Sequence, residues 1–175
     1  MEIRQLTEKD MDQAIRLKLD CWKEELAGKL DIPLNFEREL SMWTNWMLTA
    51  EQDNDLRCLI GVFDQHKLIG VAFASFIESI HAPEEGIELN GLWVDQNHRG
   101  KHISYQLIQS ILETYQPYGV KKLIVYCMAY APANQYYLKL GGKKIAREYQ
   151  FNEQLPVDIF EFDMDHLHLY ITNAF

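Results

Sequence analysis

The stretch from residue 87 to residue 127 constrains the fold more than any other part of the sequence. An apolar run at 87–94 is followed by a polar segment at 95–102 and by a helical pattern that ends before Pro117. A second apolar run at 123–127 completes the unit. A strand, helix and strand joined in this order place the two strands parallel and adjacent in one sheet. The apolar side chains of the predicted helix recur on one face; they are Ile103, Leu107, Ile108, Ile111, Leu112 and Tyr115.

Further strands and helices are predicted on both sides of this unit. A short strand at the amino terminus precedes two amphipathic helices, and a capping box of Thr7 and Asp10 begins the first of them. An antiparallel meander, a short helix at 133–140 and two closing strands complete the order. We therefore predict one domain, residues 1–175, of the α/β class (α+β in the broad sense). Its mixed central sheet has about six or seven strands and about four flanking helices. The outer strands are predicted at 3–6, 57–63, 68–77, 144–151 and 157–164, and the first two helices at 11–26 and 36–47.

Composition excludes several classes of partner. The 175 residues include 17 basic and 26 acidic side chains, and the net charge of −9 argues against a uniformly basic nucleic-acid-binding protein. No apolar run approaches the roughly 20 residues that cross a bilayer, and the charged first residues lack the pattern of a signal peptide. The three cysteines form no CxxC pair, so neither a disulfide framework nor a zinc knuckle is encoded. We expect a cytoplasmic protein with reduced thiols that binds neither nucleic acid nor membrane.

Charge is unevenly distributed along the chain. Residues 96–147 contain eight lysines and arginines and a single acidic residue, Glu113, whereas the rest of the chain is strongly acidic. This pattern favours a basic part of the chain that attracts an anion and an acidic part that attracts a cation. Ordinary solvated surface charge explains the same pattern, and the sequence does not separate the two.

The polar segment between the first strand and the helix has the features of an anion site. Free backbone N–H groups at a helix N-terminus carry partial positive charge, Gly100 allows close approach of the main chain, and Arg99 and Lys101 add full charges. Such a segment suits a pyrophosphate. It matches neither GxxxxGK[ST] nor GxGxxG, so a P-loop is excluded and a Rossmann dinucleotide site is unsupported. An ordinary strand-to-helix loop remains the alternative.

Three segments together resemble the GNAT superfamily of N-acetyltransferases. The first is the strand end Leu92-Trp93-Val94, and the second is the segment 99–104, which is similar to the family's R/Q-x-x-G-x-G/A phosphate loop. The third runs from Ala133 to Gly142 and looks like the family's A-x-x-F-Y-x-K-L-G-F helix and turn. His102 and Ser104 stand where the family usually has glycine or alanine, and Tyr130 stands where an asparagine often opens the third segment.

The resemblance implies an enzyme that moves an acetyl group from acetyl-CoA directly to a primary amine of a small molecule or peptide. It implies that Glu88 is the general base and that Tyr137 donates a proton to the coenzyme sulfur. The backbone of the strand end would pair with the pantetheine arm if the two parallel strands splay apart, as they do in the family. Homodimers are common in the family, so the resemblance also allows a homodimer. The implied coenzyme-binding residues are Leu92, Trp93, Val94, Arg99, Gly100, Lys101, His102, Ile103 and Ser104.

Both implied catalytic residues have an alternative explanation. In an ideal strand Glu88, Asn90 and Leu92 share one face, and a bulge would change that phase. Glu88 is then either the base or a solvated carboxylate. Tyr137 and the preceding Tyr136 are either functional or part of the hydrophobic core.

The sequence constrains the site of the amine acceptor less than it constrains the coenzyme site. We predict walls formed by Trp22, Trp43 and Trp46, because tryptophan faces attract cations. The acidic side chains of Glu24, Glu25, Glu84 and Glu85 would favour a cationic amine. The alternative is that tryptophans at helical spacing simply pack in the core.

No metal site is expected. His166 and His168 would share one face of a strand in the partly apolar tail, but no third ligand has matching spacing, so we predict no metal. The tail, residues 166–175, would either add a strand or cover a dimer partner.

Two other functions remain open. The replaced glycines at 102 and 104 favour a non-catalytic module that binds or senses acyl-CoA on the same fold. The second alternative is a protein-interaction domain that binds no coenzyme.

Overall fold

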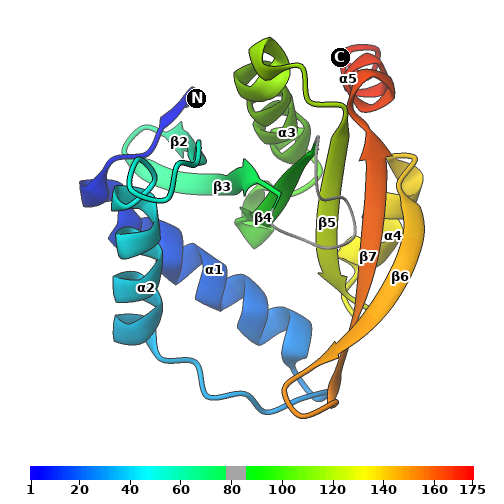
Figure 1. The fold of residues 1–175 in the computed structure, drawn as a ribbon. Coiled ribbons are helices and arrows are strands. Elements are labelled where there is room, and N and C mark those ends of the chain that lie inside the picture. Colours follow the sequence, from blue (N-terminus) through cyan, green and yellow to red (C-terminus); the bar gives the residue numbers. More distant parts are fainter. Residues whose placement is uncertain (78–85) are drawn as a thin grey trace.

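Seven strands form one mixed sheet in the computed structural model, which describes residues 1–77 and 86–175. The strand order is β1-β2-β3-β4-β5-β7-β6 (Figure 1). All pairs are antiparallel except β4 with β5, which are parallel as the crossover predicts. The strands are β1 (Glu2–Gln5), β2 (Cys58–Asp64), β3 (Lys67–Phe76), β4 (Gly86–Val94), β5 (Lys122–Met128), β6 (Lys143–Gln150) and β7 (Leu155–Asp163).

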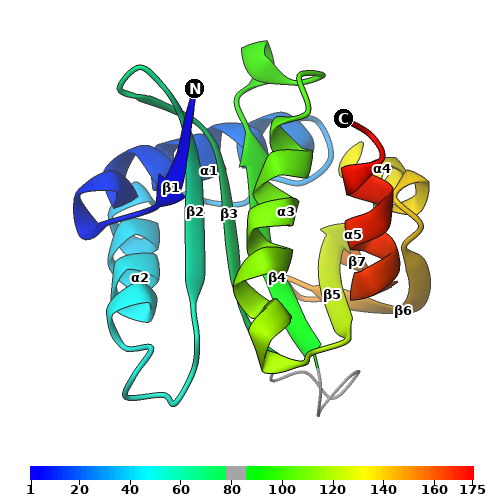
Figure 2. The same cartoon turned by 90° about the horizontal axis from the view of Figure 1, so that it is seen from above.

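Helices cover both faces of the sheet. One face of its amino-terminal half carries α1 and α2, and the opposite face carries α3 and α5 (Figures 1 and 2). The short helix α4 joins α3 and α5 in packing around the main core cluster. The helices are α1 (Met11–Leu26), α2 (Phe36–Leu48), α3 (Ile103–Tyr115), α4 (Ala133–Lys139) and α5 (Met164–Thr172). No helix in the described ranges is long and apolar enough to cross a membrane.

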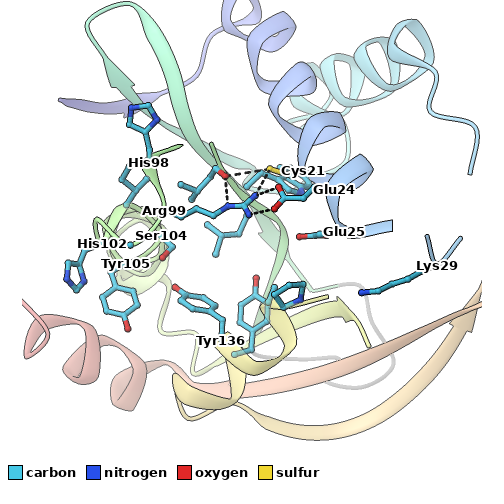
Figure 3. Close-up of a pocket in the computed structure, with 18 residues that line it drawn as sticks. Cys21, Glu24, Glu25, Lys29, His98, Arg99, His102, Ser104, Tyr105 and Tyr136 are labelled. Atoms are coloured by element: carbon cyan, nitrogen blue, oxygen red, sulfur yellow. Dashed lines mark hydrogen bonds and ion pairs between the residues drawn. The ribbon is translucent and has the colours of Figure 1, made fainter. Parts of the chain in front are cut away.

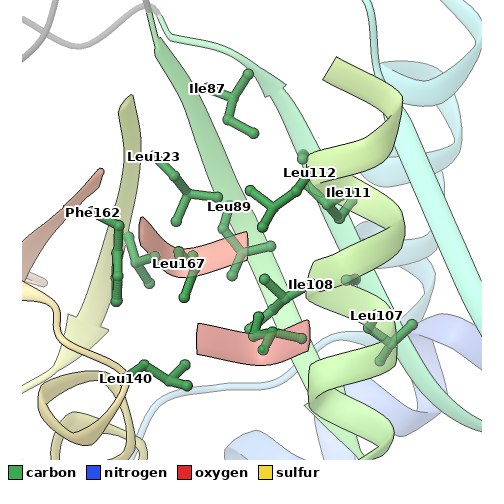
Figure 4. Packing of buried hydrophobic residues seen from close by; sticks show 14 of the residues in the cluster. Ile87, Leu89, Leu107, Ile108, Ile111, Leu112, Leu123, Leu140, Phe162 and Leu167 are labelled. Carbon is green, nitrogen blue, oxygen red and sulfur yellow. The ribbon is translucent and has the colours of Figure 1, made fainter. Parts of the chain in front are cut away.

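The main core lies between α3 and the centre of the sheet. Figure 4 shows Leu107, Ile108, Ile111 and Leu112 of α3 directed toward β4, β5 and α5. The stripe that predicted this helix is therefore the stripe that is buried, and Leu107 and Ile111 have no exposed surface. The packing anchors the first turn of α3 against the end of β4.

The parallel strands β4 and β5 separate along their length. They are paired only from Gly86–Leu89 to Lys122–Val125, where β4 begins. Beyond Leu89 the ladder between them shows no further pairs among the described residues, although β4 stays paired to β3 up to Val94. The edge of β4 that faces β5 is therefore open just before the loop at 95–102.

A bulge in β4 changes which side chains share a face. Asn90 is an extra residue in the ladder with β3 and reverses the alternation at that point. Glu88 is paired with Ser75, whose hydroxyl lies 3.1 Å from the Asn90 side-chain oxygen, while Leu92 packs into the α3 core. The strand is therefore not ideal: the bulge that the sequence analysis left open is present, and Leu92 does not share a face with Glu88.

The carboxyl-terminal tail is a helix and not a strand. Helix α5 begins at Met164, where the Asp163 carboxylate accepts a hydrogen bond from the His166 amide at 2.9 Å. Leu167 and Ile171 are buried against α3, which is why the tail is partly apolar. His166 and His168 therefore do not share a strand face, and the tail adds a fifth helix. The predicted turn at 82–86 lies, apart from Gly86, outside the described residues, as do Glu84 and Glu85.

Candidate active site

A cavity of about 520 Å³ lies at the open edge of β4. The end of β4, the loop before α3, the first turn of α3, the start of α4 and the carboxyl-terminal half of α1 surround it (Figure 3). All predicted coenzyme-binding residues except Lys101 line it, together with Tyr136 and Tyr137. The further lining residues are Cys21, Glu24, Glu25, Lys29, His98, Tyr105, Pro132 and Ala133.

The loop before α3 turns twice through left-handed backbone. Asp95 fixes its start by accepting hydrogen bonds from the Asn97 amide at 2.9 Å and from Lys67 at 3.0 Å. Gly100 and His102 then have φ of +74° and +58°. The amides of His102, Ile103 and Ser104 find no hydrogen-bond acceptor among the described residues. This is the arrangement that binds a phosphate group at a helix N-terminus.

His102 occupies a left-handed position that glycine adopts without strain. It is the N-cap of α3 and lies just before the helical residues. Its ring packs against Tyr105 at 5.3 Å and against Phe175 at 5.8 Å between centroids. Figure 3 shows it beyond Tyr105, away from the Arg99 side of the cavity. The side chain therefore points away from that side, as a tolerated replacement of glycine requires.

Arg99 is held by α1 and does not project freely into the cavity. Its guanidinium donates to both carboxylate oxygens of Glu24, at 2.7 and 2.9 Å, and its Nε donates to the Val94 carbonyl at 3.1 Å. The ion pair raises the pKa of Arg99. Lys29, in the turn that follows α1, makes a second bridge by donating to the Tyr130 carbonyl at 2.8 Å. Helix α1 and the turn after it thus span the cavity between the phosphate-type loop and the segment before α4.

Two tyrosines of α4 form the opposite wall. Tyr137 is 6% exposed, and burial, followed by Cys127, Tyr136 and Glu25, raises the pKa of its hydroxyl well above the usual value. The buried hydroxyl of Tyr136 has no hydrogen-bond partner within residues 1–77 and 86–175. Burial raises the pKa of Tyr136 as well, and the nearby Ser104 side chain partly opposes that effect. Both hydroxyls are protonated at neutral pH and are able to donate.

Glu88 lies in a different cavity. This second cavity, of about 450 Å³, lies beside α2, and neither Leu92 nor Tyr137 lines it. Arg57 in its wall is paired with Asp53 at 2.6 Å and with Asp55 at 3.0 Å. The structure therefore does not bring Glu88 and Tyr137 into one cavity. The other residues of the second cavity are Trp46, Ser75, Phe76 and Asn90.

The predicted acceptor tryptophans surround cations of the chain itself. The Lys18 ammonium is 4.6 Å from the ring centre of Trp22 and 5.3 Å from that of Trp43, and it is ion-paired with Glu39. The Arg57 guanidinium lies 4.8 Å from Trp46. These internal contacts give the tryptophans a structural explanation. A role as substrate walls stays a prediction, and Trp46 lines the second cavity.

The sequence analysis missed the contribution of one face of α1. Cys21 and Glu25 are four residues apart and share one face of α1, and Lys29 follows in the turn after the helix; all three line the first cavity. The sequence analysis names Glu25 only as part of the acidic half. The i, i+4 spacing of Cys21 and Glu25 near the end of the helix was the signal available.

Comparison with known proteins gives the same fold. The acetyltransferase (GNAT) family model matches residues 12–142. An N-acetyltransferase from Staphylococcus aureus Mu50 has 20% identity and a TM-score of 0.70, covering 93% of this chain and 98% of that chain. A ribosomal-protein-alanine N-acetyltransferase from Brucella melitensis has 19% identity and a TM-score of 0.70, covering 93% and 99%. The PaiA N-acetyltransferase from Thermoplasma acidophilum, in complex with coenzyme A, has 20% identity and a TM-score of 0.68, covering 93% and 98%.

A search among curated protein sequences finds no match to this chain. The family match nevertheless covers well over half of the chain, and it includes the open edge of β4, the loop before α3 and helix α4. The sequence resemblance and the fold thus agree with it. The chain belongs to the GNAT family of N-acetyltransferases, whose acetyl donor is acetyl-CoA.

Proposed function

We propose that the protein transfers an acetyl group from acetyl-CoA directly to a primary amine of a small molecule or peptide. The observation that carries the proposal is the combination, in one cavity, of an unpaired edge of β4, unbonded amides at the start of α3 and the Tyr137 hydroxyl. These groups fit the coenzyme. The amides suit its diphosphate, the open strand edge suits its amide-containing arm, and the unpartnered Tyr136 hydroxyl offers one further donor.

The chemistry divides among residues of this chain. Acetyl-CoA supplies an activated thioester. Backbone amides at the end of β4, at Trp93 and Val94, are the candidates to stabilise negative charge on the carbonyl oxygen. Tyr137 donates the proton that the departing thiolate needs, because a thiol pKa near 8.5 makes the protonated sulfur the better product at neutral pH. Arg99 and its Glu24 partner hold the loop against α1 while this happens.

A non-catalytic module that binds acyl-CoA is the second candidate. Two observations favour it: His102 occupies the left-handed position of a family glycine, and Arg99 is already paired with Glu24. Such a module would bind acetyl-CoA and leave every amine unchanged.

One experiment separates the two functions. Calorimetry with acetyl-CoA is followed by a thiol-release assay with a panel of polyamines, aminoglycosides, amino acids and peptides with free amino termini. Transfer predicts both heat on binding and thiol release that requires one class of amine. Binding without release for any class supports the module, and the absence of binding contradicts both candidates.

We further propose that residues 1–175 act as one domain, in the cytoplasm. Supporting the location, Cys21, Cys58 and Cys127 are all free thiols, which is usual in a reducing compartment. A homodimer remains an expectation from the family, and sedimentation at several protein concentrations measures it.

A further inference from the structure

The carboxylate of Glu25 lies in the first cavity without a hydrogen-bond or ion-pair partner among the described residues. It projects from α1 toward the space between the Arg99–Glu24 pair and the tyrosines of α4 (Figure 3). The side chain is half-buried, and no hydrogen bond or ion pair to it is found in the part of the chain that the structure describes. A carboxylate that loses part of its hydration without gaining a hydrogen bond or counter-charge is destabilised, and a bound cation offsets that cost. One that faces a cavity without a partner is therefore available to a ligand.

The charged groups around Glu25 leave that carboxylate available. Glu24, its neighbour on α1, is committed to Arg99, and Lys29 donates to the Tyr130 carbonyl. Burial raises the pKa of Glu25, with Arg99 and Lys29 acting in the opposite direction and Glu24 in the same direction. Its other titratable neighbours are uncharged at neutral pH, because burial raises the pKa of Cys21 to about 11, that of Cys127 to about 12 and that of Tyr137 above its usual range.

The position of Glu25 differs from that of Glu88 in one decisive way. Glu25 and Tyr137 line the same cavity, and the Glu25 charge acts on the Tyr137 hydroxyl. Glu88 lines the second cavity and does not line the first. A base and an acid that act on one reacting centre must both reach it. The described geometry satisfies this for Glu25 with Tyr137.

We propose that Glu25 is the group that binds the substrate ammonium and accepts its proton. This inference rests on the proposed transferase function. The ammonium nitrogen loses one proton to the Glu25 carboxylate, and the free amine forms a C–N bond with the thioester carbonyl carbon. The C–S bond then breaks, and the thiolate sulfur takes a proton from Tyr137. The second nitrogen proton returns to Tyr137, and Glu25 releases its own to solvent, so one proton is released per acetyl group transferred.

The test compares Glu25→Gln with the parent protein and with two other variants. Glu25→Gln keeps the size of the side chain and removes its charge. We expect kcat/KM for the amine to fall at least about 100-fold at pH 7, which is the usual scale for loss of a general base. We expect the Kd for acetyl-CoA, measured by calorimetry, to stay within about twofold. The parent rate should fall on the acid side with an apparent pKa above the ordinary glutamate value of about 4.3, and this acid limb should be absent in the variant.

Two control variants distinguish failure of the Glu25 proposal from failure of the proposed transferase function. Asp20→Asn removes an exposed carboxylate from the same helix, outside both cavities, and should leave kcat/KM unchanged. Glu88→Gln tests the rival base. If Glu25→Gln keeps the parent rate and acid limb while Glu88→Gln loses them, Glu25 is overturned and the transferase function stands. If the parent binds acetyl-CoA but acetylates no amine, the transferase function fails and the role of Glu25 fails with it.

Discussion

The two sides of the molecule that meet at the first cavity differ in how their polar groups are satisfied. On the β4–α3–α4 wall, the amides of 102–104 and the Tyr136 hydroxyl have no partner among the described residues. On the α1–α2 side, charges are matched within the chain, as in Lys18 with Glu39 and Arg99 with Glu24. Buried polar groups that lack partners are costly, so the unsatisfied wall is the one shaped for a ligand. Glu25 is the exception on the α1 side, which is why it carries the inference above.

In the basic segment, residues 96–147, several lysine and arginine side chains are likewise paired with acidic side chains of the same chain. Lys144 and Arg147 both pair with Asp158, which is 2% exposed and also accepts from Asn134. Lys121 and Lys122 likewise lie near acidic side chains of the following segments. Much of the positive charge counted along the sequence is therefore used locally. The backbone of the loop, more than this charge, distinguishes the site.

The largest expected effect comes from the α4 wall. Tyr137→Phe removes one buried hydroxyl and should lower kcat by about 100-fold or more, because the thiolate loses its proton donor. Affinity for acetyl-CoA should stay within about twofold in calorimetry. The effect would confirm that the chemistry lies on the unsatisfied wall.

Two conservative variants control this prediction. Tyr118→Phe alters a tyrosine that is 59% exposed and remote from the cavity, and it should keep the parent kcat. Tyr136→Phe removes the neighbouring hydroxyl. Loss of turnover in that variant, with turnover kept in Tyr137→Phe, would assign the proton donor to Tyr136.

The next prediction tests whether charged side chains on the α1–α2 side stabilise one another. Glu39→Gln leaves the Lys18 ammonium, which is 4% exposed, without its counter-charge. We expect the free energy of unfolding to fall by about 2–3 kcal/mol in urea titrations. The double variant Lys18→Met/Glu39→Gln removes both charges and should recover to within about 1 kcal/mol of the parent.

Glu37→Gln is the control for that series, since Glu37 is exposed on the same helix. It should change stability by less than about 0.5 kcal/mol. A stable Glu39→Gln protein would show that the tryptophans hold Lys18 without a counter-ion. A changed KM for the amine in the double variant would restore Trp22 and Trp43 as candidates for the acceptor wall.

Acid should destabilise both sides of the molecule. Hydrogen bonds from Arg4 and from Arg147 hold the pKa of Asp10 and of Asp158, respectively, well below the usual range, and bonds from His98 and Lys67 lower that of Asp95 to about 2. The folded pKa of each is below the unfolded value of about 3.9, so the stabilisation is complete above that value and is lost as pH falls through the folded pKa. Melting temperatures should therefore be level near neutral pH and decrease below about pH 4. A Tm that stays constant to pH 2.5 would contradict these pairings.

The smallest effect concerns His102. His102→Gly removes the conformational strain of a non-glycine residue in left-handed backbone, which costs about 1 kcal/mol. It also loses the ring contacts with Tyr105 and Phe175. The net change in unfolding free energy should be below about 1 kcal/mol, and acetyl-CoA affinity should change less than about threefold. His102→Asn is the matched control, because asparagine tolerates the same backbone. A large gain in affinity in both variants would show that the imidazole obstructs the coenzyme.

Most of the fold was predictable because it follows from the local periodicity of apolar and polar side chains. The stripe of α3 and the parallel pair β4 and β5 follow from side-chain spacing and from the handedness of crossover connections. The tail was misassigned because nine helical residues with two apolar anchors, Leu167 and Ile171, give too short a pattern to separate helix from strand. Within the site, the loop at 99–104 and Tyr137 could be named from the family motif.

The sequence by itself determined the strand, glycine-containing loop and helix that leave backbone amides free at the start of α3. Only the tertiary structure decided which side chains accompany them. One extra residue, Asn90, puts Glu88 and Leu92 on different faces of β4. Helix α1 brings Glu24 and Glu25 to the first cavity, where Glu24 pairs with Arg99, 75 positions along the chain. Backbone amides at a helix start are available whatever the neighbouring residues are. A carboxylate acquires its role from the groups that long-range packing places around it.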